Sequence, residues 1–416
     1  MEQATHGPAK PSPSNLAAIA ICTAIFFLDG LIHTVIGPMA PGIARDMALG
    51  KAALGPIFSA NLIGQTLGLL GFPLLARRFG HRATVIFAVF GFCLAQIATA
   101  LAWNGGSLFA FRLIDGIFLG GCMPSCLVIT TKLAPPGRLG LAMMALFTGY
   151  GSGATVSGIL ASVFLGNGGW RISIALVGAM SLLNALAAIV WLRGVDEFPS
   201  ARQRAKPVIR ALDVLAPRLL GGTLMLWLMF MAMLTVQYCL SSWLPTLLVE
   251  LGRDPSFAAL SVTIFSLGGI IAALGVGILI DRFGGTPVLG GFLLIATVLL
   301  FITGQVLATA SAGVLMALLI SGGFFFLGAY GGINYLLATY YEDDLRAIGI
   351  GLTKSIGRVG TILAPVLIGY GLLWGVRQTT IMSLFAVPSA LATAAVFVVG
   401  YLVRHRARSK QVHRNE

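Results

Sequence analysis

The sequence predicts an all-helical membrane protein whose twelve transmembrane helices form two related halves. Of its 416 residues, 57% are hydrophobic and 10% are charged, whereas soluble domains carry about 25% charged residues. The apolar residues gather in stretches long enough to cross a bilayer, which takes about 20 residues. Short motifs also recur at a constant spacing along the chain. These three observations together define the fold class.

The first half begins after a polar start, residues 1–15, which is rich in Pro and Ser and is predicted to be disordered. The helical half itself is predicted over residues 16–192. It contains six apolar segments at 16–39, 53–75, 83–102, 107–131, 139–165 and 172–192.

A polar, basic linker over residues 193–218 separates this half from the second, which is predicted over residues 219–403. The second half again contains six apolar segments, at 219–249, 257–280, 286–309, 312–340, 348–373 and 378–403. A basic tail, residues 404–416, follows the last segment.

The Lys and Arg residues predict the orientation. Most of them fall in the loops that share a side with both termini, and cytoplasmic loops are enriched in Lys and Arg. Both termini are therefore predicted to be cytoplasmic. The net charge of +13 follows this topology, so no nucleic-acid partner is expected.

The internal repeat has an offset of 204 residues, at which Arg78-Phe79-Gly80 lines up with Arg282-Phe283-Gly284. At the same offset Pro41 lines up with Pro245, and Trp170 with Trp374. Parallel repeats of six helices are a known transporter architecture, with the substrate site near the bilayer midplane.

The first apolar segment carries the motif FFLDGLIH at residues 26–33. Asp29 and His33 are four residues apart and share a helix face. An ionisable group at this depth is costly and is functional by default. The pair predicts a proton-handling site, although His33 is equally well explained as a hydrogen-bonding partner of a neighbouring helix.

Two further segments carry charged pairs. Arg112 and Asp115 share a face of the fourth segment; Arg112 either binds a substrate carboxylate or is held in a structural ion pair with Asp115. Lys354 and Arg358 share a face of the eleventh segment. The planar fork of Arg358 suits a carboxylate, whereas Lys354 either joins it or extends to the lipid headgroups.

Other polar and aromatic residues complete the candidate set. Tyr330 and Asn334 place a ring and an amide on one face of the tenth segment and are predicted to contact substrate. Trp243 is interpreted as an anchor at the membrane interface. Asn61 and Gln65 are interpreted as helix–helix contacts rather than ligands.

Enzymatic motifs are not found. The sequence contains no GxxxxGK[ST] nucleotide loop, nucleophile elbow or zincin motif, so we expect no enzymatic activity and no cofactor. The five Cys residues lie in apolar segments without the spacing of a metal site, and no metal is expected.

The loop at residues 71–82, GFPLLARRFGHR, resembles the loop signature of the major facilitator superfamily. Arg77 replaces its usual Asp, while the second-half copy keeps Asp281. This resemblance implies the major facilitator fold, with gating loops that contain Arg78, Gly80, Asp281, Arg282 and Gly284.

Within that superfamily the chain resembles the aromatic acid:proton symporters. The resemblance rests on the motif around Asp29, the run FRLIDGIFLGGCMPS (111–125), GWR (169–171), WLPTLL (243–248) and the glycines around Arg358. The family's second acid in the first segment is replaced by Ile32, and a later acid by Lys132. Asp115 or His33 is the candidate to replace the missing acid.

The resemblance implies a proton-coupled importer of small organic anions, most simply aromatic carboxylates, that works by alternating access in a bacterial inner membrane. The expected partners are the organic anion, protons and the lipid bilayer, and the chain is expected to be monomeric. The alternatives are a proton-driven exporter of hydrophobic compounds on the same fold and a transporter-like membrane sensor.

Overall fold

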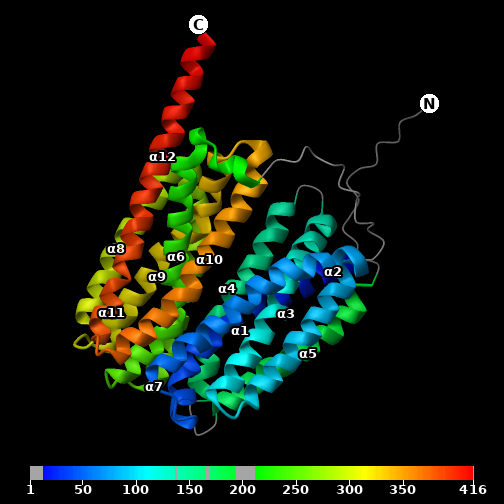
Figure 1. The fold of residues 1–416 in the computed structure, drawn as a ribbon, viewed down its shortest axis with the longest axis vertical. Helices are drawn as coiled ribbons and strands as arrows, with labels where there is room; N and C mark the ends of the chain where they lie inside the picture. Colours follow the sequence, from blue (N-terminus) through cyan, green and yellow to red (C-terminus); the bar gives the residue numbers. More distant parts are fainter. Residues whose placement is uncertain (1–12, 136–137, 165–168, 194–210, 416) are drawn as a thin grey trace. The chain divides into compact units, whose positions relative to one another are not determined.

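The computed structural model describes residues 13–135, 138–164, 169–193 and 211–415, and within these ranges all regular structure is helical (Figure 1). The helices are α1 (Pro13–Asp46), α2 (Lys51–Ala100), α3 (Gly105–Leu133), α4 (Leu139–Val163), α5 (Gly169–Trp191), the short 3-10 helix η2 (Ala211–Leu215), α6 (Pro217–Glu250), α7 (Pro255–Phe283), α8 (Gly285–Val306), α9 (Ala312–Tyr340), α10 (Asp343–Leu373), α11 (Gln378–Leu384) and α12 (Ala386–Asn415).

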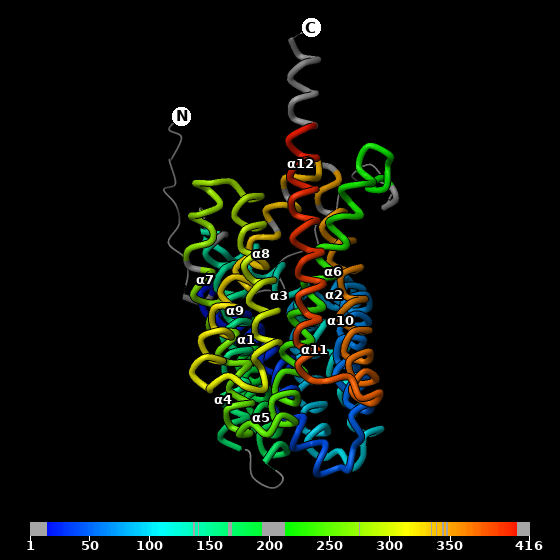
Figure 2. Tube along the Cα trace, turned by 90° about the vertical axis from the view of Figure 1, so that its left-hand side faces the viewer, coloured from blue at the N-terminus to red at the C-terminus, as the bar shows by residue number. Residues whose placement is uncertain are grey.

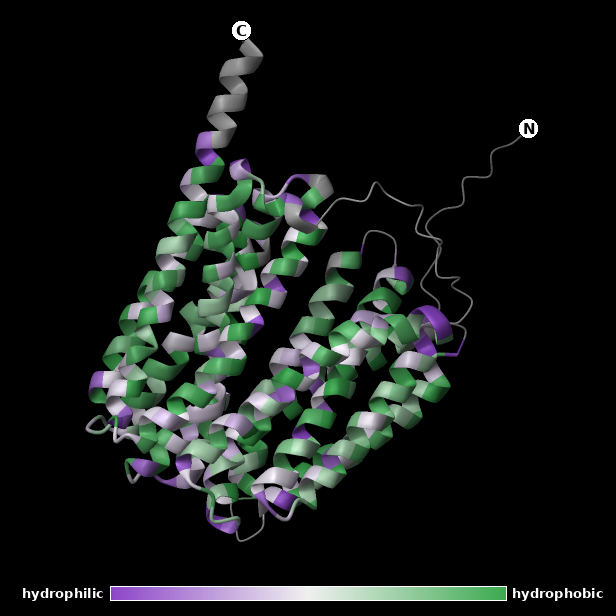
Figure 3. Cartoon of the chain, in the orientation of Figure 1, coloured by the Kyte–Doolittle hydropathy of each residue, from purple (hydrophilic) through white to green (hydrophobic). Residues whose placement is uncertain are grey.

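Ten helical segments in the described chain are long and apolar enough to cross a membrane. One of them is α2, whose 50 residues correspond to about 75 Å of helix, more than twice the thickness of a bilayer core. The two arms of α2 correspond to the predicted segments 53–75 and 83–102, and α4 to the predicted segment 139–165, although α4 is not among the ten. Figure 3 shows the hydrophobic colouring that runs along these helices.

Gly80 divides α2 into its two arms. Its backbone angles, φ 84° and ψ 162°, lie in a region that is open essentially to Gly alone. Gly284, between α7 and α8, adopts φ 85° and ψ 152°. In each turn an Arg lies over the next residue's ring, Arg78 over Phe79 and Arg282 over Phe283, both at 5.3 Å. The predicted repeat therefore has the same local structure in both copies.

The chain divides into two compact units. The first consists of the described residues within Met1–Val35, Ala60–Val156 and Gly168–Arg204, and the second of those within Ile36–Ser59, Ser157–Asn167 and Ala205–Glu416. The units do not follow the repeat throughout, because the end of α1 and the start of α2 pack with the second unit. The domain limits drawn from the repeat stay a prediction.

Three segments outside the predicted helical halves are covered unevenly. Of the predicted disordered start and the predicted linker, the structure describes only 13–15, 193 and 211–218, and the other residues lie outside the described ranges. The basic tail continues α12 as a helix to Asn415. The predicted order of apolar segments is unaffected.

Glycines bring α2 and α3 into close contact in the first unit. A Cβ on Gly64 would collide with the backbone carbonyl of Leu113, and one on Gly116 with that of Asn61. A Cβ on Gly120 would in turn collide with the carbonyl of Gln65. Small residues four apart allow this approach between membrane helices. The crossing places Asn61 and Gln65 beside α3.

In the second unit, α9 packs against α7 and α8, while α6 packs against α10 and α12. Figure 2 shows α8, α9 and α12 on the face turned toward the viewer. Aromatic rings contribute to these contacts: the ring centroids of Phe292 on α8 and Phe325 on α9 are 5.1 Å apart.

Trp243 of α6 lies in the core of the second unit. Its side chain has no exposed surface, its ring meets Phe58 edge-on at 5.1 Å, and its Nε1 donates a hydrogen bond to the carbonyl of Pro365 at 3.2 Å. The interpretation of Trp243 as an anchor at the membrane interface is therefore wrong. Its polar N–H is satisfied by a backbone carbonyl of α10.

Candidate functional site

Asp29 and His33 lie on one buried face of α1, with 2% and 8% of their surface exposed. Close packing holds this part of α1 against α4: a Cβ on Gly30 would collide with the carbonyl of Tyr150, and one on Gly153 with that of Phe27. Gly30, which follows Asp29, therefore fixes the position of the Asp29 carboxylate relative to α4.

The amide of Gln65 joins the two titratable groups. Its Nε2 lies 3.3 Å from Asp29 Oδ1, 3.3 Å from His33 Nδ1 and 3.2 Å from Asn61 Oδ1. Gln65 is only 3% exposed, so these contacts are made away from the surface. Asp29 and His33 thus share one amide from α2.

Asp115 is the second buried carboxylate of this unit and is fully enclosed, with 0% of its surface exposed. Its Oδ2 accepts from Asn61 Nδ2 at 3.0 Å, from Gln96 Nε2 at 3.2 Å and from Arg112 Nη1 at 3.2 Å. Three donors on one oxygen stabilise the carboxylate in a medium where an isolated charge is very costly.

Arg112 completes this cluster with 1% of its surface exposed. Besides its ion pair with Asp115, it donates from Nη2 to the carbonyl of Ile32 at 3.2 Å. The structure thus shows Arg112 in the ion pair that was one of the two predicted arrangements. The residue that replaces the family's second acid contacts Arg112 through its backbone.

The buried polar network of the first unit is therefore continuous from Asp29 through Gln65 and Asn61 to Asp115. Asn61 and Gln65 join helices, as their positions in the sequence predict, but they also connect the two carboxylates. Gln96 was missed, although a polar amide in the middle of an apolar segment was a signal for it.

The second unit holds the remaining predicted substrate residues. Lys354 is exposed and Arg358 half-buried on α10, and Tyr330 is half-buried on α9. Tyr330 interacts electrostatically with Arg358 and with Tyr238 of α6, and its ring centroid lies 6.0 Å from that of Phe230. An arginine and an aromatic cluster therefore come together here.

Asn334 lies in α9 one turn after Tyr330, but its side chain is outside the described part of the structure. Its predicted role as a substrate contact stays a prediction.

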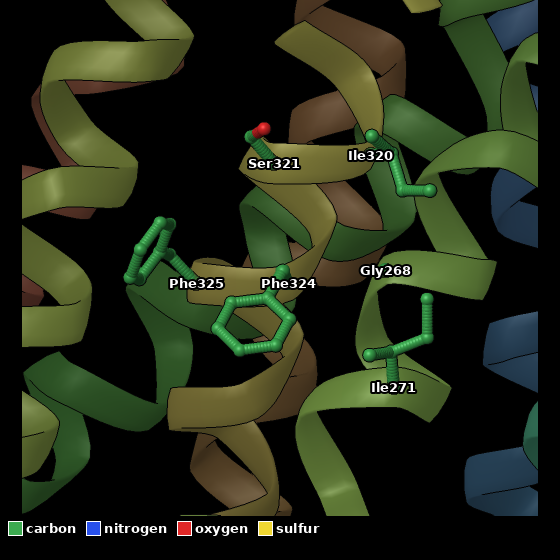
Figure 4. A pocket seen from close by; sticks show the side chains of 6 residues that line it. All are labelled: Gly268, Ile271, Ile320, Ser321, Phe324 and Phe325. Atoms are coloured by element: carbon green, nitrogen blue, oxygen red, sulfur yellow. The ribbon is translucent and has the colours of Figure 1, made fainter. Parts of the chain in front are cut away.

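A cavity of about 310 Å³ opens between α7 and α9 in the second unit (Figure 4). It is lined by Gly268, Ile271, Ile320, Ser321, Phe324 and Phe325. None of the predicted site residues reaches it, and it holds no titratable side chain that could recognise an anion. The cavity does not form part of the candidate site.

The predicted gating residues occupy the two related turns. Arg78 and Gly80 lie in the turn of α2, and Asp281, Arg282 and Gly284 lie where α7 ends. Next to the first turn, His81 Nδ1 lies 3.2 Å from Ser125 Oγ, and burial and the positive charge of Lys132 lower the pKa of His81. Lys132, noted above as a departure from the family, thus acts on this turn.

Within the described ranges, no three His, Cys, Asp or Glu side chains gather in a way that could hold a metal ion. The five Cys residues are free and buried.

Comparisons with known proteins agree with this architecture. The 4-hydroxybenzoate transporter PcaK of Pseudomonas putida is 32% identical, covering 93% of this chain and 92% of that protein. The 3-(3-hydroxy-phenyl)propionate transporter of Escherichia coli (strain K12) is also 32% identical, covering 95% and 96%. The crystal structure of a D-xylose-proton symporter has the same fold, with a TM-score of 0.76 at 16% identity over 92% of this chain and 97% of that one.

The predicted resemblance is confirmed by these relatives and by a family model. The model of the Major Facilitator Superfamily matches residues 22–253 and 226–416, which together span nearly the whole chain. The chain belongs to the Major Facilitator Superfamily.

Proposed function

We propose that this chain is a proton-coupled importer of small aromatic carboxylates of the benzoate or hydroxybenzoate type. As a member of a transporter superfamily, it is a multi-pass membrane transporter and not an enzyme. The printed names of its relatives support aromatic acids as the substrate class. The observation that carries proton coupling is the buried network that connects Asp29 with Asp115.

Asp29 is the proposed proton-coupling carboxylate, with His33 and Asp115 as its partners. A carboxylate that is 2% exposed pays a high desolvation cost when it is charged, and hydrogen-bond donors offset that cost. Under this proposal, the protonation of Asp29 changes as its surroundings change during transport. Transport by alternating access would then let Asp29 load a proton from one side and release it to the other.

The proposed carboxylate ligands are Arg358 and Lys354, with Arg112 as a third cation when it is released from Asp115. Arg358 already lies near Tyr330, so a planar guanidinium and an aromatic ring are presented together. Guanidinium groups bind carboxylates through two parallel hydrogen bonds. Tyr330 and Asn334 would hold the aromatic part of the substrate.

The remaining properties are proposed from the sequence and the family. The transporter would lie in a bacterial inner membrane with both termini in the cytoplasm, in keeping with its basic loops. It would act as a monomer without a cofactor, driven by the proton gradient alone.

The test is accumulation of radiolabelled 4-hydroxybenzoate by proteoliposomes with an imposed pH gradient. We expect Asp29→Asn to abolish accumulation but to spare counterflow, the exchange of labelled for unlabelled acid, because exchange requires no net proton movement. Asp46→Asn is the matched control, since Asp46 is an exposed acid at the end of the same helix.

The proposal predicts that a protonophore removes accumulation by the unaltered protein. Full accumulation by Asp29→Asn would exclude Asp29 as the coupling site. Gradient-driven movement of the acid in the outward direction only would instead identify an exporter.

A further inference from the structure

The amide nitrogen of Gln65 has more polar neighbours than it has hydrogens. Oδ1 of Asp29, Oδ1 of Asn61 and Nδ1 of His33, which accepts in the tautomer protonated at Nε2, all lie within 3.3 Å of its Nε2. An amide nitrogen carries two hydrogens, so at most two of these contacts are full hydrogen bonds at one time. The protonation states of Asp29 and His33 decide which two are made.

Protonation of either His33 or Asp29 changes the hydrogen bonds of Gln65. When His33 is protonated at Nδ1, that atom becomes a donor and no longer accepts from Gln65. When Asp29 is protonated, its carboxyl becomes a weaker acceptor and itself a donor. In both cases the amide is released toward Asn61 or turns to present its oxygen.

Asn61 carries this change to α3. Its Oδ1 accepts from Gln65 at 3.2 Å, and its Nδ2 donates to Asp115 Oδ2 at 3.0 Å. Asp115 is in turn paired with Arg112. A stronger or weaker bond from Gln65 therefore alters how firmly Asn61 supports that ion pair.

The backbone at this point leaves little freedom to slide. The carbonyls of Asn61 and Gln65 lie directly against Gly116 and Gly120 of α3. This contact fixes the positions of Asn61 and Gln65 along the helix axis relative to Asp115. A change in the hydrogen bonds of Gln65 therefore alters the neighbouring side-chain hydrogen bonds rather than moving α2 along α3.

We propose that Gln65 is a positioning residue that links the protonation state of Asp29 and His33 to the Arg112–Asp115 ion pair. The inference rests on the proposed proton-coupling role of Asp29. It gives Gln65 a role in coupling beyond joining helices, because its donor is shared between the groups that gain and lose the proton.

Other titratable groups face this region and belong to the same balance. The thiol of Cys122 on α3 interacts electrostatically with Asp29 and with the thiol of Cys22, both on α1. The titratable and charged residues of the helices around Gln65 are Cys22, Asp29, His33, Arg112, Asp115, Cys122, Cys126 and, at the α4 crossing, Tyr150.

The test is the pH profile of uptake by Gln65→Met, which keeps the volume of the side chain but removes the amide. A donor favours the charged form of a carboxylate and the neutral form of a histidine whose lone pair it meets. Without that donor both groups take up a proton more readily. We expect the alkaline limit of uptake to move up by about one pH unit, with counterflow at saturating acid retained within about twofold.

The matched control is Asn184→Leu, which removes another buried amide of the first unit, 8% exposed on α5. A merely structural role predicts that both variants lose transport in proportion to folded protein, with unchanged pH profiles. If Gln65→Met does not fold, Gln65→Asn keeps an amide that is one methylene shorter, and the same upward shift is expected.

The two proposals fail separately. If Asp29→Asn abolishes accumulation and the folded Gln65 variant has the pH profile of the unaltered protein, the inference about Gln65 is overturned and the transport proposal stands. If Asp29→Asn accumulates the acid normally, the proton-coupling role itself is lost.

Discussion

Two ion pairs of similar length lie in opposite surroundings. Arg112 and Asp115 are 3.2 Å apart in the first unit, with their side chains 1% and 0% exposed. Lys51 and Glu250 are 3.0 Å apart in the second unit, with 47% and 18% exposure. The two pairs have nearly the same distance, but they differ in burial. Loss of one member of the buried pair leaves an unpaired buried charge and strongly destabilises the fold, whereas loss of one member of the exposed pair costs little.

The difference shows that burial, rather than distance, decides how strongly an ion pair constrains its two members. A buried pair holds its two members in one geometry, because neither can be left without a partner at acceptable cost. Arg358 and Lys354 on α10 lie at more open positions, half-buried and exposed, and are the proposed ligands of the substrate anion. We therefore expect the effect of removing a single charged side chain to be larger the more deeply that side chain is buried.

The largest effect is expected for Asp115→Leu. It leaves Arg112 as a buried charge without its partner, which typically costs about 3–5 kcal/mol. Thermal unfolding of detergent-purified protein, with the yield of folded protein, measures the loss. The double variant Arg112→Met with Asp115→Leu should recover most of the stability, and a stable single variant would contradict the comparison.

A medium effect is expected for Arg358→Lys, which keeps the charge but loses the planar fork. We expect the half-saturating concentration for counterflow to rise about tenfold, equivalent to about 1.4 kcal/mol, while the amount of folded protein stays unchanged. Lys354→Gln is the companion variant and should raise that concentration less. Unchanged transport in Arg358→Lys would make this arginine structural.

The smallest effect is expected for Lys51→Ala. Glu250 keeps a hydrogen bond from Gln378 at 2.8 Å, and exposed pairs contribute about 0.2–1 kcal/mol. Unfolding measured at low and high salt should show the difference shrink as salt screens the pair. A loss as large as that of Asp115→Leu would remove the distinction between the two pairs.

The fold was predictable because bilayer thickness imposes long apolar helices, and the repeat at Gly80 and Gly284 could be read directly from the sequence. The pairing of Arg112 with Asp115 was one of two arrangements that their spacing allowed. The sharing of Gln65 by Asp29 and His33 was not predictable, because it depends on the depth at which the α2 and α3 glycines cross. Burial of Trp243 likewise depends on a contact with Pro365 that is distant in sequence.

The contacts around Pro365 have a mechanical consequence for α10. Ser59 Oγ donates to the carbonyl of Ile362 at 2.6 Å, and Trp243 Nε1 donates to that of Pro365 at 3.2 Å. Neighbouring side chains thus clamp the helix where its proline interrupts the backbone ladder. Because these contacts lie near the end of α10, they divide it into a short arm and a longer arm that carries Lys354 and Arg358, and any bend at this point would displace the far end of the longer arm most.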